Sequence, residues 1–136
     1  MYTHILVGID PHHEDGNEAA LHMAMHLAEN ANSRITAMSV VEPVSAEYAE
    51  QLPKDATRIA GQTAMDRLRK TVGPTSEVAT EIANGRAADE LNAFAAENGV
   101  DCIVIASHKP GLRDYFLGST AARVVRHAPC SVHVMR

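Results

Sequence analysis

The fold class is decided by residues 102–107, Cys-Ile-Val-Ile-Ala-Ser. This run is apolar up to its final serine and lacks the polar alternation of a strand with one face in water. Strands of this kind are buried on both faces, as in parallel sheets that helices cover. Four other runs have a strand-like composition, and together the five predict five strands: His4–Ile9, Arg34–Val41, Glu77–Ala83, Cys102–Ser107 and Ser131–Met135.

Segments with helical periodicity separate these runs. They are Asn17–Asn30, a helix that ends at Val72, Ala87–Asn98, and a helix that begins at Gly118-Ser119-Thr120. Residues 44–57 are polar and weakly periodic, which predicts an irregular loop. Strands and helices that alternate at about 30 residues per unit predict an α/β fold with right-handed crossovers. We therefore expect a doubly wound five-stranded parallel sheet with helices on both faces, a Rossmann-like open sandwich.

Composition bounds the class of protein. The chain has 136 residues, 46% of them hydrophobic, which predicts one domain spanning residues 1–136. Its 12 basic and 17 acidic residues give a net charge of −5, which argues against nucleic acid or an anionic membrane as a partner.

The sequence shows no sign of a membrane segment. No apolar run reaches the roughly 18 residues of a spanning helix, so we expect no membrane insertion. Residues 1–3 lead straight into a strand without a leader pattern, so we expect a cytoplasmic location. Cys102 and Cys130 stand apart, which predicts reduced, buried thiols.

Charge is distributed unevenly along the chain. Residues 1–57 carry two basic and nine acidic side chains, whereas residues 58–136 carry ten basic and eight acidic ones. The segment 108–136 is clearly cationic, with a single acidic residue, Asp114. A local cationic end on an acidic protein favours a small anionic ligand over a polyanion.

The predicted ligand site is the crevice at the carboxyl ends of the strands. Gly118-Ser119-Thr120 opens a helix there, so its unpaired N–H groups and dipole favour an anion. An equally weighted alternative is that Ser119 only caps the helix. Asp10 follows the first strand, where its carboxylate either meets a nucleoside or closes an Asx turn ahead of Pro11. Lys109 either neutralises phosphate or is a solvated loop residue.

Eight histidines raise the question of a metal site, but their spacing does not favour one. His22 and His26 lie on the helix face predicted to be exposed, and the adjacent His12 and His13 rarely converge on one ion. No nucleophile elbow or P-loop motif is present. We therefore expect no metal ligands and no dedicated catalytic residues.

Three blocks of the chain resemble the universal stress protein family. They are His4-Ile5-Leu6-Val7-Gly8-Ile9-Asp10, Ser39-Val40-Val41-Glu42, and the ending that runs from Ile103 to His108, through Leu117-Gly118-Ser119-Thr120, to Val124–Val134. Nucleotide-binding members of that family carry G-x-x-G, nine residues, then G-[ST]. Here Ala106 and Lys109 replace the two glycines and the loop is one residue shorter, while Gly118-Ser119 is intact. This pattern is similar to the F/G-type branch of bacterial members, some of which bind adenine nucleotides.

The resemblance implies a site and a role. Asp10 contacts adenosine, the backbone of Val40 meets the adenine edge, Ala106 and Ser107 line the ribose and phosphate side, and Gly118, Ser119 and Thr120 bind the phosphates. The implied ligand is ATP, AMP or ADP, and any Mg²⁺ is carried by the phosphates. The implied function is a stress-response protein in which the nucleotide is a regulatory signal, with slow hydrolysis or autophosphorylation left open. The family also implies a homodimer through the last strand and an unknown regulatory protein partner. The alternative function is a nucleotide-free dimeric adaptor.

Overall fold

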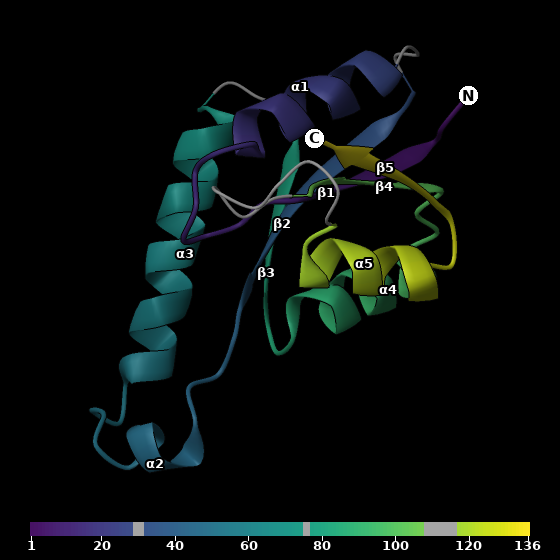
Figure 1. The fold of residues 1–136 in the computed structure, drawn as a ribbon. Coiled ribbons are helices and arrows are strands. Elements are labelled where there is room, and N and C mark those ends of the chain that lie inside the picture. Colours follow the sequence, from purple (N-terminus) through teal and green to yellow (C-terminus); the bar gives the residue numbers. More distant parts are fainter. Residues whose placement is uncertain (29–31, 75–76, 108–116) are drawn as a thin grey trace.

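The computed structural model describes residues 1–28, 32–74, 77–107 and 117–136. Five strands form one parallel sheet in the order β3-β2-β1-β4-β5 (Figure 1). Their bounds are β1 (His4–Gly8), β2 (Arg34–Val41), β3 (Ala79–Asn84), β4 (Cys102–Ala106) and β5 (Ser131–Met135). The predicted α/β fold with a five-stranded parallel sheet is therefore confirmed.

Helices cover both faces of this sheet, as expected for a doubly wound fold. They are α1 (Asn17–Leu27), α2 (Ala46–Ala49), α3 (Ala56–Val72), α4 (Ala87–Glu97) and α5 (Ser119–His127). Leu6 and Ile103 are buried under α4 and α5, and Ile5 and Val104 under α1 and α3. All four side chains are 0% exposed. Burial on both faces explains why the central strands are apolar at consecutive positions.

The prediction of an irregular loop over residues 44–57 is wrong in part. The short helix α2 lies within it, and α3 already begins at Ala56. No residue of α2 is buried, and Figure 1 shows α2 beyond the end of α3 and away from the sheet. A helix without a buried face has no apolar stripe, so hydrophobic periodicity did not reveal it.

At the amino-terminal ends of the strands, polar groups form hydrogen bonds with one another. The Asp101 carboxylate accepts bonds from the Thr3 N–H and hydroxyl (2.8 and 2.9 Å) and from the His4 N–H (3.0 Å). Desolvation by itself raises the pKa of Asp101, but these bonds outweigh it and lower that pKa below its ordinary value. The buried His4 ring lies 2.9 Å from the Thr36 hydroxyl and 3.1 Å from the Asn98 carbonyl oxygen. These polar groups are therefore paired within the fold. The ligand crevice is expected at the other ends of the strands, the carboxyl ends.

Strand order reverses at β1, because the chain builds outward to β2 and β3 on one side and to β4 and β5 on the other. In open α/β sheets a ligand crevice lies outside the carboxyl ends of the strands at such a reversal. This topology places the ends of β1 and β4 side by side, and with them Asp10, Ser107 and the start of α5.

Candidate functional site

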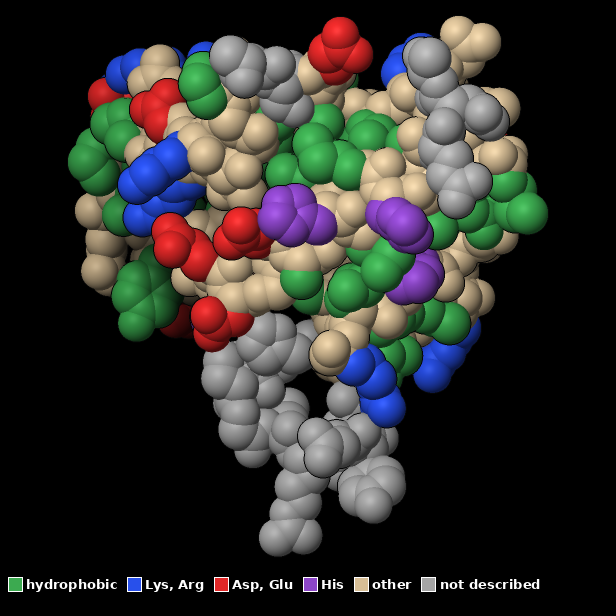
Figure 2. Space-filling model, turned by 90° about the horizontal axis from the view of Figure 1, so that it is seen from above, with side chains coloured by type: hydrophobic (Ala, Val, Ile, Leu, Met, Phe, Trp, Pro, Cys, Tyr) green, Lys and Arg blue, Asp and Glu red, His purple; other side chains and the backbone are tan. Residues whose placement is uncertain are grey.

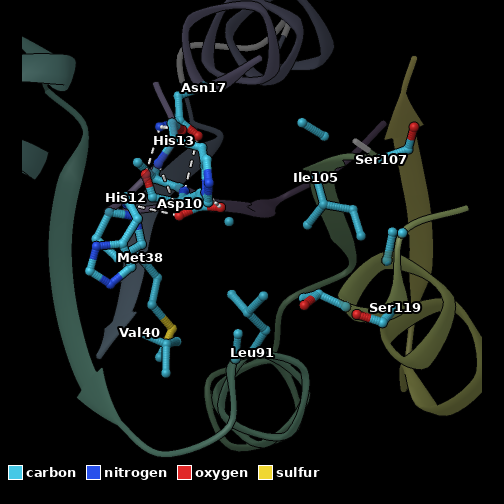
Figure 3. A pocket seen from close by; sticks show the side chains of 18 of the residues that line it. Asp10, His12, His13, Asn17, Met38, Val40, Leu91, Ile105, Ser107 and Ser119 are labelled. Atoms are coloured by element: carbon cyan, nitrogen blue, oxygen red, sulfur yellow. Dashed lines mark hydrogen bonds and ion pairs between the residues drawn. The ribbon is translucent and has the colours of Figure 1, made fainter. Parts of the chain in front are cut away.

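A cavity of about 330 Å³ lies at this point of the sheet. Its volume is within the range of small-molecule sites. Figure 3 shows Asp10, His12 and His13 on one side of it and Ser107 and Ser119 on the other. Seven described residues that the sequence or the family resemblance suggested for the ligand line this cavity: Asp10, Val40, Ala106, Ser107, Gly118, Ser119 and Thr120.

The floor of the cavity is apolar and depends on a glycine that the sequence analysis did not single out. Met38, Val40, Leu91 and Ile105 line it, and each is at most 6% exposed. At Gly8, a Cβ atom would lie 2.9 Å from Ile105 Cγ2 and 3.2 Å from Leu91 Cδ1. Glycine at the end of β1 therefore lets these two side chains form the floor without a clash.

The backbone N–H and C=O groups of Val40 face the crevice. The Met38 carbonyl accepts a 2.8 Å bond from the Ile9 N–H, so the peptide groups of Met38 point toward β1. The direction of the peptide groups alternates from one residue to the next along a strand, so the N–H and C=O of Val40 point to the same side as those of Met38. The pairing of β1 with β2 has already ended there, at the pair Gly8 and Met38. A flat ligand in the cavity therefore meets one backbone donor and one backbone acceptor.

Asp10 closes an Asx turn, the alternative that the sequence left open, and it also lines the cavity. Its Oδ1 accepts the N–H of His12 at 2.8 Å and of His13 at 3.3 Å. Its Oδ2 lies 3.0 Å from Nδ1 of the His13 ring. The turn leaves the carboxylate with further capacity at the cavity, because each carboxylate oxygen accepts more than one hydrogen bond.

Asn17, which the sequence analysis missed as a site residue, holds this loop in place. It is 4% exposed. Its Oδ1 accepts from the Asp10 N–H (3.0 Å), and its Nδ2 donates to the carbonyls of Asp10 (2.9 Å) and His13 (3.0 Å). Arg67 of α3 supports the loop from outside through a 2.9 Å bond to the Pro11 carbonyl. The sequence signal was an asparagine at the first position of a helix, directly after the Gly16 turn.

The opposite wall is the amino terminus of α5. Gly118 is the N-cap, with φ of −55°, and α5 has no side-chain capping bond, so the alternative in which Ser119 caps the helix is wrong. Ala122 donates the first helical bond, to the Gly118 carbonyl at 2.8 Å. The N–H groups before Ala122 have no partner within the helix, and together with the dipole they favour an anion at this wall.

Ala106 fits its position without strain. It occupies the place of the first glycine of the family motif, and no described non-glycine residue has a positive φ. The substitution therefore does not distort the end of β4. Lys109, which the sequence suggested for the phosphate, lies outside the described residues.

A second helix terminus at the crevice, that of α4, already has a carboxylate partner. Glu42 Oε1 accepts the N–H of Ala87, the first residue of α4, at 3.3 Å. A carboxylate at this helix terminus competes with any ligand anion, so α5 is the more favourable phosphate site of the two.

The cationic character expected near the ligand is not found in the described lining. Arg123 donates instead to Asp89 at 2.8 Å, and this bond lowers the pKa of the Asp89 carboxyl. None of the described lining residues is Lys or Arg, while Asp10, Asp15 and Glu42 bring three carboxylates.

The exposed histidines and the thiols lie elsewhere. Figure 2 views the molecule from the α1 side and shows histidine and acidic side chains on that face. His22 and His26 of α1 are exposed, as predicted, and so is Glu18. Burial, with smaller effects of Cys130 and Asp101, raises the pKa of Cys102 to about 11, and burial also raises the pKa of the half-buried Cys130. Among the residues that the structure describes, no three His, Cys, Asp or Glu side chains are grouped to hold a metal ion. None of the helices in that part of the chain is long and apolar enough to cross a membrane.

Comparison with known proteins identifies similar sequences and folds. A profile of the universal stress protein family matches residues 1–136. A universal stress protein of Methanocaldococcus jannaschii is 30% identical over 132 residues, which cover 90% of this chain and 78% of that protein. The structure of UspA from Lactobacillus plantarum is 26% identical, has a TM-score of 0.78 and covers 99% of this chain and 98% of its own.

Two further structures share the fold and contain nucleotides. A universal stress protein in complex with cAMP is 21% identical, with a TM-score of 0.64 over 99% of this chain and 97% of that one. A universal stress protein from Archaeoglobus fulgidus in complex with dAMP is 20% identical, with a TM-score of 0.62 over 99% of this chain and 98% of that one.

Proposed function

Because the chain belongs to the universal stress protein family, we propose that it binds an adenine nucleotide, namely ATP, ADP or AMP, at the carboxyl edge of its sheet. The observation that carries the proposal is a cavity of about 330 Å³ with an apolar floor and, in its wall, an α5 amino terminus without a side-chain cap. Such a cavity suits a base, and such a terminus suits a phosphate. The cAMP and dAMP complexes of proteins with this fold support the same ligand class.

The geometry favours one orientation of the nucleotide. The adenine lies on the apolar floor, with its edge against the backbone donor and acceptor of Val40. The ribose lies toward Asp10, whose Oδ2 accepts one bond from His13 and retains capacity for a hydroxyl. The phosphates lie at Gly118, Ser119 and Thr120, and Ala106 and Ser107 line the ribose and phosphate side.

In this proposal the nucleotide is a regulatory signal of a stress-response protein rather than the substrate of a fast enzyme. The polar groups of the described residues that line the cavity are suited to holding a ligand in place rather than to activating a nucleophile. Any Mg²⁺ would arrive with the phosphates, and hydrolysis would be slow. A regulatory protein partner would read the bound state.

The ligand is tested by acid extraction of the purified protein and by thermal unfolding with AMP, ADP and ATP, with and without Mg²⁺. We expect adenine absorbance near 260 nm in the extract, which is easy to detect because the chain has no Trp. Added nucleotide should also stabilise the folded state, by about 2.7 kcal/mol at a concentration of 100 Kd. An extract without adenine and a melting temperature that no nucleotide changes would contradict the proposal and favour the nucleotide-free adaptor.

We also propose that two copies pair through β5. This strand is an edge of the sheet, and its Val132 and Val134 are only partly buried. The Met135 carbonyl accepts the Ser107 N–H at 2.8 Å, so the peptide groups of Met135 face β4 and those of Val134 face outward. Val134→Pro therefore removes an outward donor and leaves the ladder with β4 intact.

Sedimentation equilibrium should show a dimer for the wild-type chain and a monomer for Val134→Pro. The surface change His22→Asn on α1 is the control and should leave the dimer unchanged. A wild-type monomer, or a Val134→Pro dimer of unchanged affinity, would rule out pairing through this edge.

A further inference from the structure

The backbone of Val40 offers a base one donor and one acceptor, and two kinds of purine edge can use this pair. Adenine presents a ring nitrogen that accepts and, beside it, a 6-amino group that donates. Hypoxanthine presents a 6-oxo group that accepts and, beside it, a ring N–H that donates. Both edges complement the N–H and C=O of one residue, so the Val40 backbone by itself does not select adenine.

The two bases differ in what they place along β2. Within one residue of a strand, the C=O lies nearer the carboxyl end of the strand than the N–H does. The adenine amino group pairs with the C=O of Val40 and therefore lies toward the carboxyl end of β2. The oxo group of hypoxanthine pairs with the N–H instead, and only a C–H group of its ring then lies toward the carboxyl end. A hydrogen-bond acceptor just beyond Val40 would therefore distinguish the two bases.

Glu42 supplies such an acceptor. It directly follows the last residue of β2, and Met38, Val40 and Glu42 all line the cavity. Side chains at alternate positions of a strand lie on one face of the sheet. The Glu42 carboxylate therefore belongs to the same face as the apolar floor, and it lies beyond Val40 in the direction of the adenine amino group.

The amino terminus of α4 holds this carboxylate at the cavity. Oε1 of Glu42 accepts the N–H of Ala87, the first residue of α4, at 3.3 Å. The positive end of the α4 dipole favours a carboxylate at this place. A carboxylate has about four lone-pair sites and this bond uses one of them, so the group is able to accept a further bond from a ligand. In Figure 3, Val40 and Leu91 of α4 lie on the side of the cavity away from Asn17, so the base floor and α4 are neighbours.

We infer that Glu42 is a specificity-determining residue of the site, whose carboxylate accepts a hydrogen bond from the 6-amino group of adenine and so favours adenine over hypoxanthine. The inference rests on the proposed function and deepens it, because it names the group that selects the base. Hypoxanthine offers this carboxylate no donor, so the complex with hypoxanthine lacks one hydrogen bond. The same side chain thus caps α4 and reads the base.

Solvent limits the size of this selectivity. Glu42 is an exposed residue, so water competes with the base for its carboxylate. A hydrogen bond to a charged group is stronger than one between neutral groups. For an exposed bond of this kind we expect a contribution of about three- to tenfold in affinity.

The test measures the Kd of AMP and IMP by calorimetry for the wild-type chain, Glu42→Ala and Glu90→Ala. IMP differs from AMP in its base alone, which is hypoxanthine. GMP is not a suitable probe, because its 2-amino group is a further donor. Purine riboside monophosphate, which has hydrogen in place of the amino group, is the third ligand. Glu90 is the matched control, because it is an acidic residue of the first turn of α4 and is not among the described residues that line the cavity.

The wild-type chain should bind AMP about three- to tenfold more tightly than IMP. Glu42→Ala should weaken AMP binding by about this factor and leave IMP and purine riboside monophosphate within about twofold of wild type. Glu42→Gln keeps a neutral acceptor and should recover part of the AMP affinity. Glu90→Ala should leave every Kd unchanged. Circular dichroism with thermal unfolding confirms that each variant is folded.

Three results would overturn the inference: equal wild-type affinities for AMP and IMP, an AMP affinity that Glu42→Ala does not change, or the same loss of AMP affinity in Glu90→Ala. A Glu42→Ala variant that binds all three nucleotides equally more weakly would also contradict it, since Glu42 would then act only through α4. In each case AMP binding by the wild-type chain still supports the proposed function. If the wild-type chain binds neither AMP nor ATP, the proposed function fails and the inference fails with it.

Discussion

Gly118→Val is expected to weaken adenine nucleotide binding by at least about 100-fold, or about 2.8 kcal/mol. A Cβ atom at this position would lie 3.2 Å from the Ser107 carbonyl oxygen, which is already a tight contact. The larger valine side chain must then occupy space at the mouth of the cavity, directly before the free N–H groups of α5. The part of the cavity that it blocks is the proposed phosphate site.

The fold should tolerate this change. Gly118 has φ of −55°, an ordinary value for any L-residue, so valine adds no backbone strain. Titration with AMP or ATP measures the affinity, and circular dichroism with thermal unfolding confirms a folded protein. Gly61→Val on α3 is the matched control, because a Cβ there meets nothing within 4 Å, and it should leave binding unchanged. A folded Gly118→Val that still binds would place the phosphate elsewhere.

Asn17→Ala is expected to lower the free energy of unfolding by about 2–3 kcal/mol. The change removes three hydrogen bonds of a buried side chain and leaves the Asp10 N–H and two loop carbonyls without these partners. Buried polar groups that lose their partners carry a full desolvation cost. The loop that carries Asp10 and His13 should loosen, so nucleotide affinity should fall as well.

Urea denaturation at neutral pH measures this loss, with Asn92→Ala as the control. Asn92 is an asparagine of α4 whose Oδ1 is buried without a partner, so its replacement should change stability by less than about 0.5 kcal/mol or raise it. If Asn17→Ala were as stable as Asn92→Ala, the loop would not depend on the Asn17 amide.

The architecture of the sheet could be predicted because its signal is local. The run 102–107 is apolar on both faces, and this pattern is required where helices cover a sheet on both sides. The order of strands and helices along the chain then allowed few sheet topologies, because connections between parallel strands of one sheet are right-handed. The helix α2 escaped prediction because it buries no residue and so leaves no apolar period.

The candidate site was predictable to a lesser degree. Residues that end a strand or begin a helix, such as Asp10 and Ser119, have positions that follow from the order of elements. Their partners do not follow from that order: the bond from Asn17 to Asp10 and the bond from the Ala87 N–H to Glu42 join residues 7 and 45 positions apart. The cationic excess of residues 108–136 was a weaker guide, since Arg123 pairs with Asp89 and does not line the cavity.

The amino-acid sequence by itself thus predicted the doubly wound sheet, a crevice at the carboxyl ends of its strands, and a helix amino terminus suited to an anion. These follow from periodicity, burial and helix dipoles, which act over one element at a time. The charge of the described cavity wall and the filled terminus of α4 arise when separate segments meet in space. Electrostatic energy depends on distance rather than on sequence spacing, and for this reason those features emerged with the folded chain.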